Sequence, residues 1–259
     1  YGPGGSVVLQ APQINLGALA TVDVSATGAD AGRLLIAASN AAGTGAVQFG
    51  ANLLGAGNAV TGLAAPMQGQ FTLDTDSAGL PGALGALNQR LNQAGFTGAR
   101  DFRFRHGDAV LDGQDRAVAH DFTLATDRGS ITLAGNSVID ASGAKGGSIR
   151  LLAGQADGVA GSGQVTLRDS ALLSVASRAT ADAGAGPAGR GGQVLIGTSA
   201  ATGMAPSGLD QGAGLHLAGG RIDATGAPPA DGAQRRDGSV TLRAPRLADG
   251  SDVAVSVLA

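Results

Sequence analysis

Residues 129–154 read GSITLAGNSVIDASGAKGGSIRLLAG, and this stretch decides the predicted fold. The phrase glycine–serine–aliphatic–x–leucine begins at Gly129 and again at Gly147. Aliphatic and polar residues alternate between glycines, which is typical of a short strand with one buried face. The segment VIDASG between the two copies predicts a further strand. The residues expected to face inward are Ile131, Leu133, Ile139, Ala141, Ile149 and Leu151.

The same phrases recur along the chain, with GSVVL from Gly5, VDVSATG from Val22 and RLLI from Arg33. After Gly129, strands are expected to start near Ile131, Val138, Ile149, Val165, Leu172, Val194, Leu215, Ile222 and Val240. Repeats of about 20 residues with two or three short strands predict stacked units that share one core. The predicted fold is therefore all-β, a right-handed parallel β-helix. A β-sandwich is the alternative, although its strands would not repeat one phrase.

Residues 83–94, ALGALNQRLNQA, break this pattern. Leu84, Leu87, Leu91 and Ala94 are spaced by three or four residues, which predicts one apolar stripe of a helix, and Gly95 is a stop signal. The chain is therefore expected to divide into three segments. Residues 1–82 are expected to form strands with a loose stretch rich in glycine and alanine, 83–95 a helical insertion, and 96–259 further strands with glycine-rich loops.

Composition excludes several classes of protein. The chain contains no cysteine, which excludes disulfides and cysteine metal sites. Hydrophobic residues make up 43% of the chain, so its 45 glycines are expected in turns of a packed domain. A net charge of −3 gives no reason to expect nucleic acid as a partner. No apolar run is long enough for a membrane-spanning helix. Because the chain begins at Tyr1 without a leader, we expect a processed or excised segment whose open strand edges associate end to end.

Three stretches resemble the repeat region of filamentous haemagglutinin-like exoproteins: FTLATDRGSITLAG (122–135), IDASGAKGGSIRLLAG (139–154) and GSVTLRAP (238–245). The segment ALNQRLNQAGFTGARDFRFRHG (86–107) resembles an insert that recurs in that family. The resemblance implies an interior shaft segment of a large adhesin of Gram-negative bacteria, exported by two-partner secretion through an outer-membrane transporter. It also implies a secreted protein at the outer cell surface that contacts a host-cell or bacterial glycan or protein. The stalk of a contact-dependent toxin carrier would look the same.

The sharpest candidate contact site is a basic patch of Arg100, Arg103 and Arg105. Paired guanidinium forks suit sulfated or acidic glycans. Phe102 and Phe104 are expected on the opposite face of the same strand, so stacking on a sugar ring is not predicted.

Motifs with catalytic spacing lack the local structure that their chemistry needs. Ser142 and Lys145 spell S-x-x-K, but they lie in a predicted turn and not at a helix start. Gly184–Gly189 spells G-x-G-x-x-G, but a strand is expected after it. His106, His120 and His216 form no metal-binding spacing, and His216 is expected to face outward. We therefore predict no catalytic, cofactor or metal site, and a protein that is not an enzyme.

One cluster keeps a second function open. Asp108, Asp112, Asp115 and Asp121 are close in sequence. Parallel β-helix polysaccharide lyases and glycosidases use grouped aspartates as calcium ligands or acid–base pairs. This alternative predicts that Asp108, Asp112 and Asp115 converge in one groove, whereas the simpler interpretation places them in solvated turns.

Overall fold

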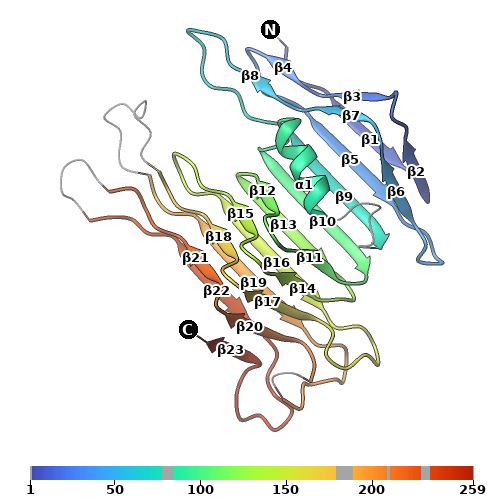
Figure 1. Cartoon of the computed structure of the whole chain (residues 1–259), viewed down its shortest axis with the longest axis vertical. Coiled ribbons are helices and arrows are strands. Elements are labelled where there is room, and N and C mark those ends of the chain that lie inside the picture. Colours follow the sequence, from blue (N-terminus) through green and yellow to red (C-terminus); the bar gives the residue numbers. More distant parts are fainter. Residues whose placement is uncertain (1, 78–83, 179–188, 209–210, 229–233, 259) are drawn as a thin grey trace.

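The computed structural model describes residues 2–77, 84–178, 189–208, 211–228 and 234–258. Its largest element is a parallel eight-stranded sheet, seen obliquely in Figure 1. In spatial order its strands are β1 (Ser6–Gln10), β5 (Arg33–Ala38), β9 (Gln70–Ser77), β10 (Ala99–His106), β13 (Asp121–Thr126), β16 (Ser148–Gly154), β19 (Gln193–Ser199) and β22 (Ser239–Arg243).

Two further parallel sheets accompany its C-terminal part. The five-stranded sheet contains β11 (Ala109–Leu111), β14 (Ile131–Leu133), β17 (Gln164–Arg168), β20 (Gly214–Ala218) and β23 (Val255–Leu258). The four-stranded sheet contains β12 (Arg116–Val118), β15 (Val138–Asp140), β18 (Leu172–Ser174) and β21 (Arg221–Asp223). The predicted all-β, parallel architecture is confirmed at this level.

Three strand pairs accompany the N-terminal part: β2 (Gln13–Leu16) with β6 (Ala46–Phe49), β3 (Thr21–Asp23) with β7 (Asn52–Leu54), and β4 (Ala26–Thr27) with β8 (Gly57–Asn58). All three pairs are parallel. The stretch rich in glycine and alanine within residues 1–82, which we expected to be loose, therefore contributes β6, β7 and β8.

The chain visits the three C-terminal sheets in rotation, and we call each round a circuit. Strands β13, β14 and β15 form one circuit, and β16, β17 and β18 form the next, each strand pairing with its counterpart. The register places like residues side by side. Leu124, for example, pairs with Phe102 on one side and Leu151 on the other.

Inward residues of successive circuits form continuous rows. The six residues expected to face inward in 129–154 are each 0% exposed. One row of the eight-stranded sheet, which we call the first inward row, runs Leu34, Phe71, Arg100, Phe122, Ile149, Val194 and Val240. The next row runs Ile36, Leu73, Phe102, Leu124, Leu151, Ile196 and Leu242. Burial of these rows is the main apolar contribution to stability.

The circuit between β9 and β10 is different, because it contains α1 (Leu84–Gln93) where other circuits have short strands. Leu84, Leu87 and Leu91 are buried, so the predicted helical stripe is confirmed. The helix packs against β11 and β12 (Figure 1). The six phenylalanines of the chain form one connected set of ring contacts beside it: Phe49, Phe71, Phe96, Phe102, Phe104 and Phe122. We call this unit the helix circuit. No helix among the described residues is long and apolar enough to cross a membrane.

Candidate binding groove on the eight-stranded sheet

The structure separates the three arginines of the predicted basic patch. Arg100 is 1% exposed and shares the inward face of β10 with Phe102 and Phe104. The prediction that Arg100 belongs to an exposed patch with Arg103 and Arg105 was therefore wrong. Side chains alternate between the two faces of a strand, so residues 100 and 103 point to opposite sides.

Arg100 instead joins β10 to α1 and the segment after it. Its Nε donates to the carbonyl of Phe96 at 2.8 Å, and its two terminal nitrogens donate to the side-chain oxygens of Asn88 at 2.8 Å and Asn92 at 2.7 Å. Burial lowers the pKa of Arg100 to about 9, and these acceptors keep the guanidinium charged at neutral pH. Its role is structural, and it cannot reach a surface ligand.

Arg103 and Arg105 do face outward, but each is paired with an aspartate. Arg103 Nη2 lies 2.8 Å from Asp127, and Arg105 Nε lies 2.9 Å from Asp74. The hydrogen bonds to Asp127 and Asp74 raise the pKa of Arg103 and Arg105, respectively. A charge already satisfied in this way offers little to an anionic ligand.

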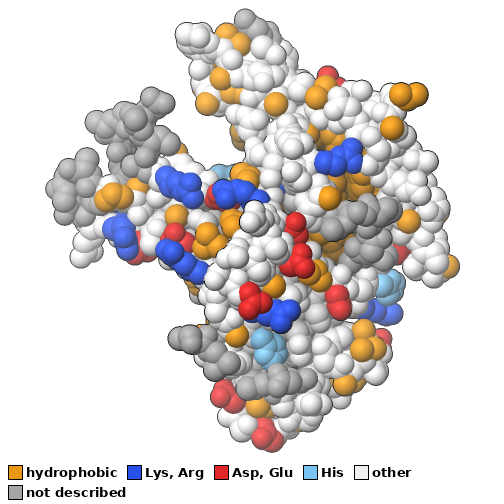
Figure 2. Space-filling view, in the orientation of Figure 1, with side chains coloured by type: hydrophobic (Ala, Val, Ile, Leu, Met, Phe, Trp, Pro, Cys, Tyr) orange, Lys and Arg blue, Asp and Glu red, His pale blue; other side chains and the backbone are white. Residues whose placement is uncertain are grey.

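Three arginines on the face that carries α1 are also close to aspartates. Figure 2 shows blue groups beside red ones over the region labelled β15, β18 and β21 in Figure 1. Arg116 lies 2.5 Å and Arg178 lies 3.9 Å from Asp140, and Arg221 lies 3.9 Å from Asp223. This face is therefore a mixed surface of ion pairs.

Two other arginines on the eight-stranded sheet stand apart from this pattern. Arg150 on β16 and Arg243 on β22 are exposed. Among the described residues, no carboxylate lies within ion-pair distance of either guanidinium. Both point away from the buried rows, because they alternate with Ile149 and Leu151 on β16 and with Leu242 on β22. Arg33 on β5 shares this property at the far end of the sheet, and the nearest charge interaction of Arg150 is a longer-range one with Asp101.

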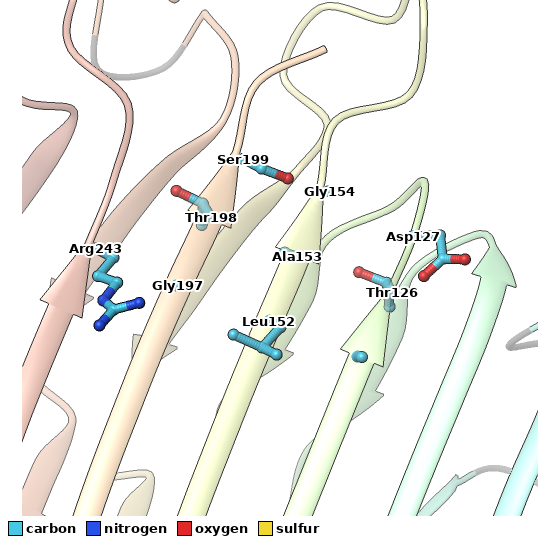
Figure 3. Close-up of a pocket in the computed structure, with 10 residues that line it drawn as sticks. Thr126, Asp127, Leu152, Ala153, Gly154, Gly197, Thr198, Ser199 and Arg243 are labelled. Atoms are coloured by element: carbon cyan, nitrogen blue, oxygen red, sulfur yellow. The ribbon is translucent and has the colours of Figure 1, made fainter.

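A shallow groove crosses the strands beside them. Its larger part has a volume of about 510 Å³ and runs from Asp127 across β16 and β19 to Arg243 (Figure 3). Gly197 forms the floor between Leu152 and Arg243, because a Cβ at this position would lie 3.1 Å from Leu152 Cδ2. A glycine inside a strand marks a place where another group can approach the backbone closely. We call this feature the sheet groove.

A second hollow of about 300 Å³ continues the sheet groove along the strands. It shares Leu152 and Arg243 with the first, and its other lining residues are Ser148, Ile149, Arg150, Gln193, Val194, Leu195, Ser239 and Thr241. The combined surface offers two unpaired cations, several hydroxyl and amide groups, and two exposed or half-buried leucines. This combination suits a ligand with anionic groups, hydroxyls and an apolar ring face.

Sequence reasoning missed this site, although a signal was present. Arg150 and Arg243 both lie in the recurrent phrase, in GSIRL and GSVTLR, at positions whose parity is outward. What the sequence does not show is that Asp127 pairs with Arg103 and leaves Arg150 and Arg243 free. That outcome depends on the register between strands.

The predicted acidic cluster does not converge. Asp112 and Asp115 share the turn after β11, where Asp115 Oδ2 accepts the amide of Asp112 at 3.1 Å. Asp108 lies at the other end of β11 and accepts a hydrogen bond from the amide of Ser130. Asp121, on β13, accepts a hydrogen bond from the hydroxyl of Ser148 on β16. No group of three or more possible metal ligands occurs among the described residues. Asp108, Asp112 and Asp115 therefore do not form the single groove that the lyase alternative predicts.

The remaining motifs are turns or strand positions. Ser142 donates to Asp140 in the turn between β15 and β16, so neither it nor Lys145 lies at a helix start. Residues 184–188 of the predicted glycine loop lie outside the described residues, and β19 follows as expected. His106 Nδ1 contacts the carbonyl of Asp76, and His120 contacts Asp121. His216 is half-buried on β20 beside the buried Leu215, so it is less exposed than an outward position implies.

Comparison with known proteins gives no relative: no family model, curated protein or solved structure matches this chain.

Proposed function

We propose that this chain is a structural segment of a secreted, filamentous haemagglutinin-like adhesin, folded as a right-handed parallel β-helix. The observation that carries the proposal is the rotation of the chain through three parallel sheets with like residues in register. Such stacking fits a rod, because each strand extends the sheets by about 4.8 Å. The resemblance of residues 122–154 to the haemagglutinin repeats supports the same identity.

In this proposal the function is to hold an outward sheet face at the cell surface. The sheet groove is the contact site, and its ligand is an anionic surface glycan that carries carboxylate or sulfate groups. Arg150 and Arg243 are two strands and about two residues apart, which places their Cα atoms about 12 Å from each other. An extended polysaccharide lying along the rod can reach both guanidinium groups.

The test is binding of the purified chain to immobilised sulfated and uronic-acid polysaccharides, with neutral dextran as the reference surface. The double variant Arg150→Ser/Arg243→Ser should bind at least about tenfold more weakly, since charge-assisted hydrogen bonds contribute about 1.5–3 kcal/mol each. Binding of the unchanged chain should weaken as salt increases.

The matched control is Arg103→Ser/Arg105→Ser, which removes the same net charge from arginines that are already paired. Its affinity should stay within about threefold of the unchanged chain. An equal loss in both double variants would show attraction by net charge alone and would remove the sheet groove from the proposal. Equal binding to neutral dextran would do the same.

A further inference from the structure

The short strand β7 pairs with β3 along one edge only, and its other edge faces the C-terminal end of α1. The amide of Asn52 donates to the carbonyl of Ala20, and the carbonyl of Leu54 accepts the amide of Val24, so Asn52 and Leu54 bond toward β3. In a parallel ladder the backbone groups of successive residues point to opposite edges of the strand. The N–H and C=O of Leu53 therefore point away from β3, toward the helix.

The helix satisfies the backbone groups on either side of this position. Arg90, in the last turn of α1, donates from its two terminal nitrogens to the carbonyls of Phe49 and Ala51, the second at 2.5 Å. After β7, the amide of Gly55 donates to the carbonyl of Ala94 at 2.7 Å. The carbonyls before β7 and the amide after it therefore have partners at the end of the helix.

Leu53, between them, has none. Within the described part of the chain, neither its N–H nor its C=O takes part in a hydrogen bond, although the residue is only 5% exposed. Buried backbone groups without a partner are rare in folded proteins and indicate a bound water or ligand. Leu53 lines a hollow of about 380 Å³ between β7 and α1, which we call the edge hollow. Other residues that line it are Ala18, Asn52, Leu54, Arg90 and Gln93.

Arg90 gives the edge hollow a positive charge. Its side chain is half-buried, and among the described residues no carboxylate lies within ion-pair distance of it. The two carbonyls that it caps occupy only two of the five N–H groups of a guanidinium. Leu54, which is 37% exposed, adds apolar surface beside it. The edge hollow therefore combines a backbone donor, a backbone acceptor and a cation that lacks a counter-charge.

We propose that the edge hollow binds an extended acidic peptide segment of a partner protein, which adds to β7 as a further strand. The backbone of the peptide forms two hydrogen bonds with Leu53, and an aspartate or glutamate of the peptide binds Arg90. A carboxylate alone could meet Arg90, but a peptide backbone also supplies the donor and the acceptor that a strand edge requires. The inference is independent of the sheet groove, which lies on other strands.

Titration of a peptide into the isotope-labelled chain, followed by nuclear magnetic resonance, tests the proposal. The probe is acetyl-Thr-Val-Asp-Val-Thr-amide, and its analogue with a methyl group on every backbone nitrogen is the control. The probe should shift the resonance of the Leu53 amide and slow its hydrogen exchange. The methylated analogue should not bind, because it has no backbone donor. Equal binding of both peptides would overturn the proposal, and so would a probe that leaves the Leu53 amide unchanged, as expected if water alone occupies the edge hollow.

The role of Arg90 is measured by the ratio of two affinities, for the probe and for its analogue with asparagine in place of aspartate. The ratio should be about tenfold for the unchanged chain, since charge-assisted hydrogen bonds are the stronger ones. It should stay above about threefold in Arg90→Lys and fall to about one in Arg90→Gln. A general weakening of the site by either substitution cancels in the ratio. A ratio that Arg90→Gln leaves unchanged would contradict an acidic ligand.

A second pair of variants leaves Arg90 in place. Gln89 and Gln93 are both exposed residues of α1, but only Gln93 lines the edge hollow. Gln93→Trp fills the space that the peptide needs and should weaken binding of the probe by at least about tenfold. Gln89→Trp adds the same side chain one turn away and should bind the probe like the unchanged chain. Unaltered binding by Gln93→Trp would place the peptide elsewhere on the molecule and overturn the proposal.

Discussion

The first inward row passes through two regions that solve the same packing problem differently. In the regular circuits it consists of Ile149 and Val194, whose counterparts lie directly beside them. In the helix circuit the same row holds Arg100, between Phe71 and Phe122. The regular circuits rely on repetition, whereas the helix circuit relies on a buried cation and its acceptors.

The reason lies in the backbone that α1 displaces. The N–H and C=O groups of a strand form hydrogen bonds with the neighbouring strands. Those of a helix bond within the helix, and the last carbonyls at its C-terminal end have no partner in the helix. Arg100 reaches this end, where a positive charge is favoured. The comparison teaches that one irregular element can be accepted in a stack if polar side chains replace the missing ladder.

The largest expected effect breaks the helix circuit at its cation. Arg100→Met leaves the carbonyl oxygen of Phe96 and the side-chain oxygen of Asn88 buried without their donor, and we expect a loss of about 3–5 kcal/mol in the free energy of unfolding. Ile149→Met, in the same row, should cost less than about 1.5 kcal/mol, because volume and polarity are conserved. Urea titration followed by circular dichroism measures both. Equal costs would show that Arg100 is only a space-filling side chain.

The next effect concerns the residue that precedes each strand of the eight-stranded sheet, which is a glycine before β16, β19 and β22. Gly192→Ala places a methyl 1.9 Å from the carbonyl oxygen of Gly147, so the backbone has to move, at a cost of about 1–3 kcal/mol. The residue before β13 is His120 instead of glycine, and it lies beside Gly98 in the segment that follows α1. His120→Ala should therefore change stability by less than about 0.5 kcal/mol. If Gly192→Ala left the free energy of unfolding unchanged, the close carbonyl of Gly147 would not explain the glycine at this position.

A smaller effect concerns the edge of β12 that faces α1, where no neighbouring strand forms hydrogen bonds with it. The side chain of Asn92 donates to the carbonyl of Arg116 at 2.8 Å and accepts the amide of Val118 at 3.0 Å. Asn92→Ala should cost about 1–2 kcal/mol, since water can replace part of these bonds. Hydrogen exchange at the Val118 amide should become faster. Gln89→Ala, on the exposed side of α1, should leave that amide unchanged, and faster exchange there would mean that general loosening of the helix explains both.

Much of the fold was predictable because its signals are local. Alternation placed the start of β14 at Ile131 and of β15 at Val138, and the leucine spacing placed α1 within one residue at each end. The same alternation places Arg100 on the face of β10 that Phe102 occupies, opposite Arg103, so the burial of Arg100 could also have been predicted. Local patterns describe each strand separately, and the partners of a side chain are a different matter.

The site was less predictable because its partners are distant in sequence. Arg103 pairs with Asp127, 24 residues later, and only the length of one circuit determines that separation. The groove depends on Gly197, which lies between Leu152 and Arg243 only once three strands are in register. Variable glycine-rich loops change the length of each circuit, so neither relation follows from a fixed period. The structure was needed to find the free arginines.

The smallest effect compares two carboxylates at the ends of two strands of the eight-stranded sheet that are separated by β10. Asp76, at the end of β9, is 1% exposed and accepts the amides of Asn40 at 2.8 Å and Gly45 at 2.7 Å, whereas the Asp127 side chain, after β13, is 38% exposed. Burial alone would raise the pKa of Asp76, but the two amides and the charge of Arg105 lower it below 3.8.

A carboxylate with a lowered pKa in the folded state contributes stability above its ordinary pKa, and the contribution is lost as the pH falls through the folded value. Asp76→Asn should therefore lower the melting temperature at pH 7, and its difference from the unchanged chain should shrink as the pH falls below 3.8. Asp127→Asn removes an exposed pair and should have a smaller effect at every pH. Thermal melts between pH 2 and pH 7 distinguish the two variants. A difference for Asp76→Asn that stays constant with pH would mean that its side-chain shape, and not its charge, holds the loop at residues 40–45.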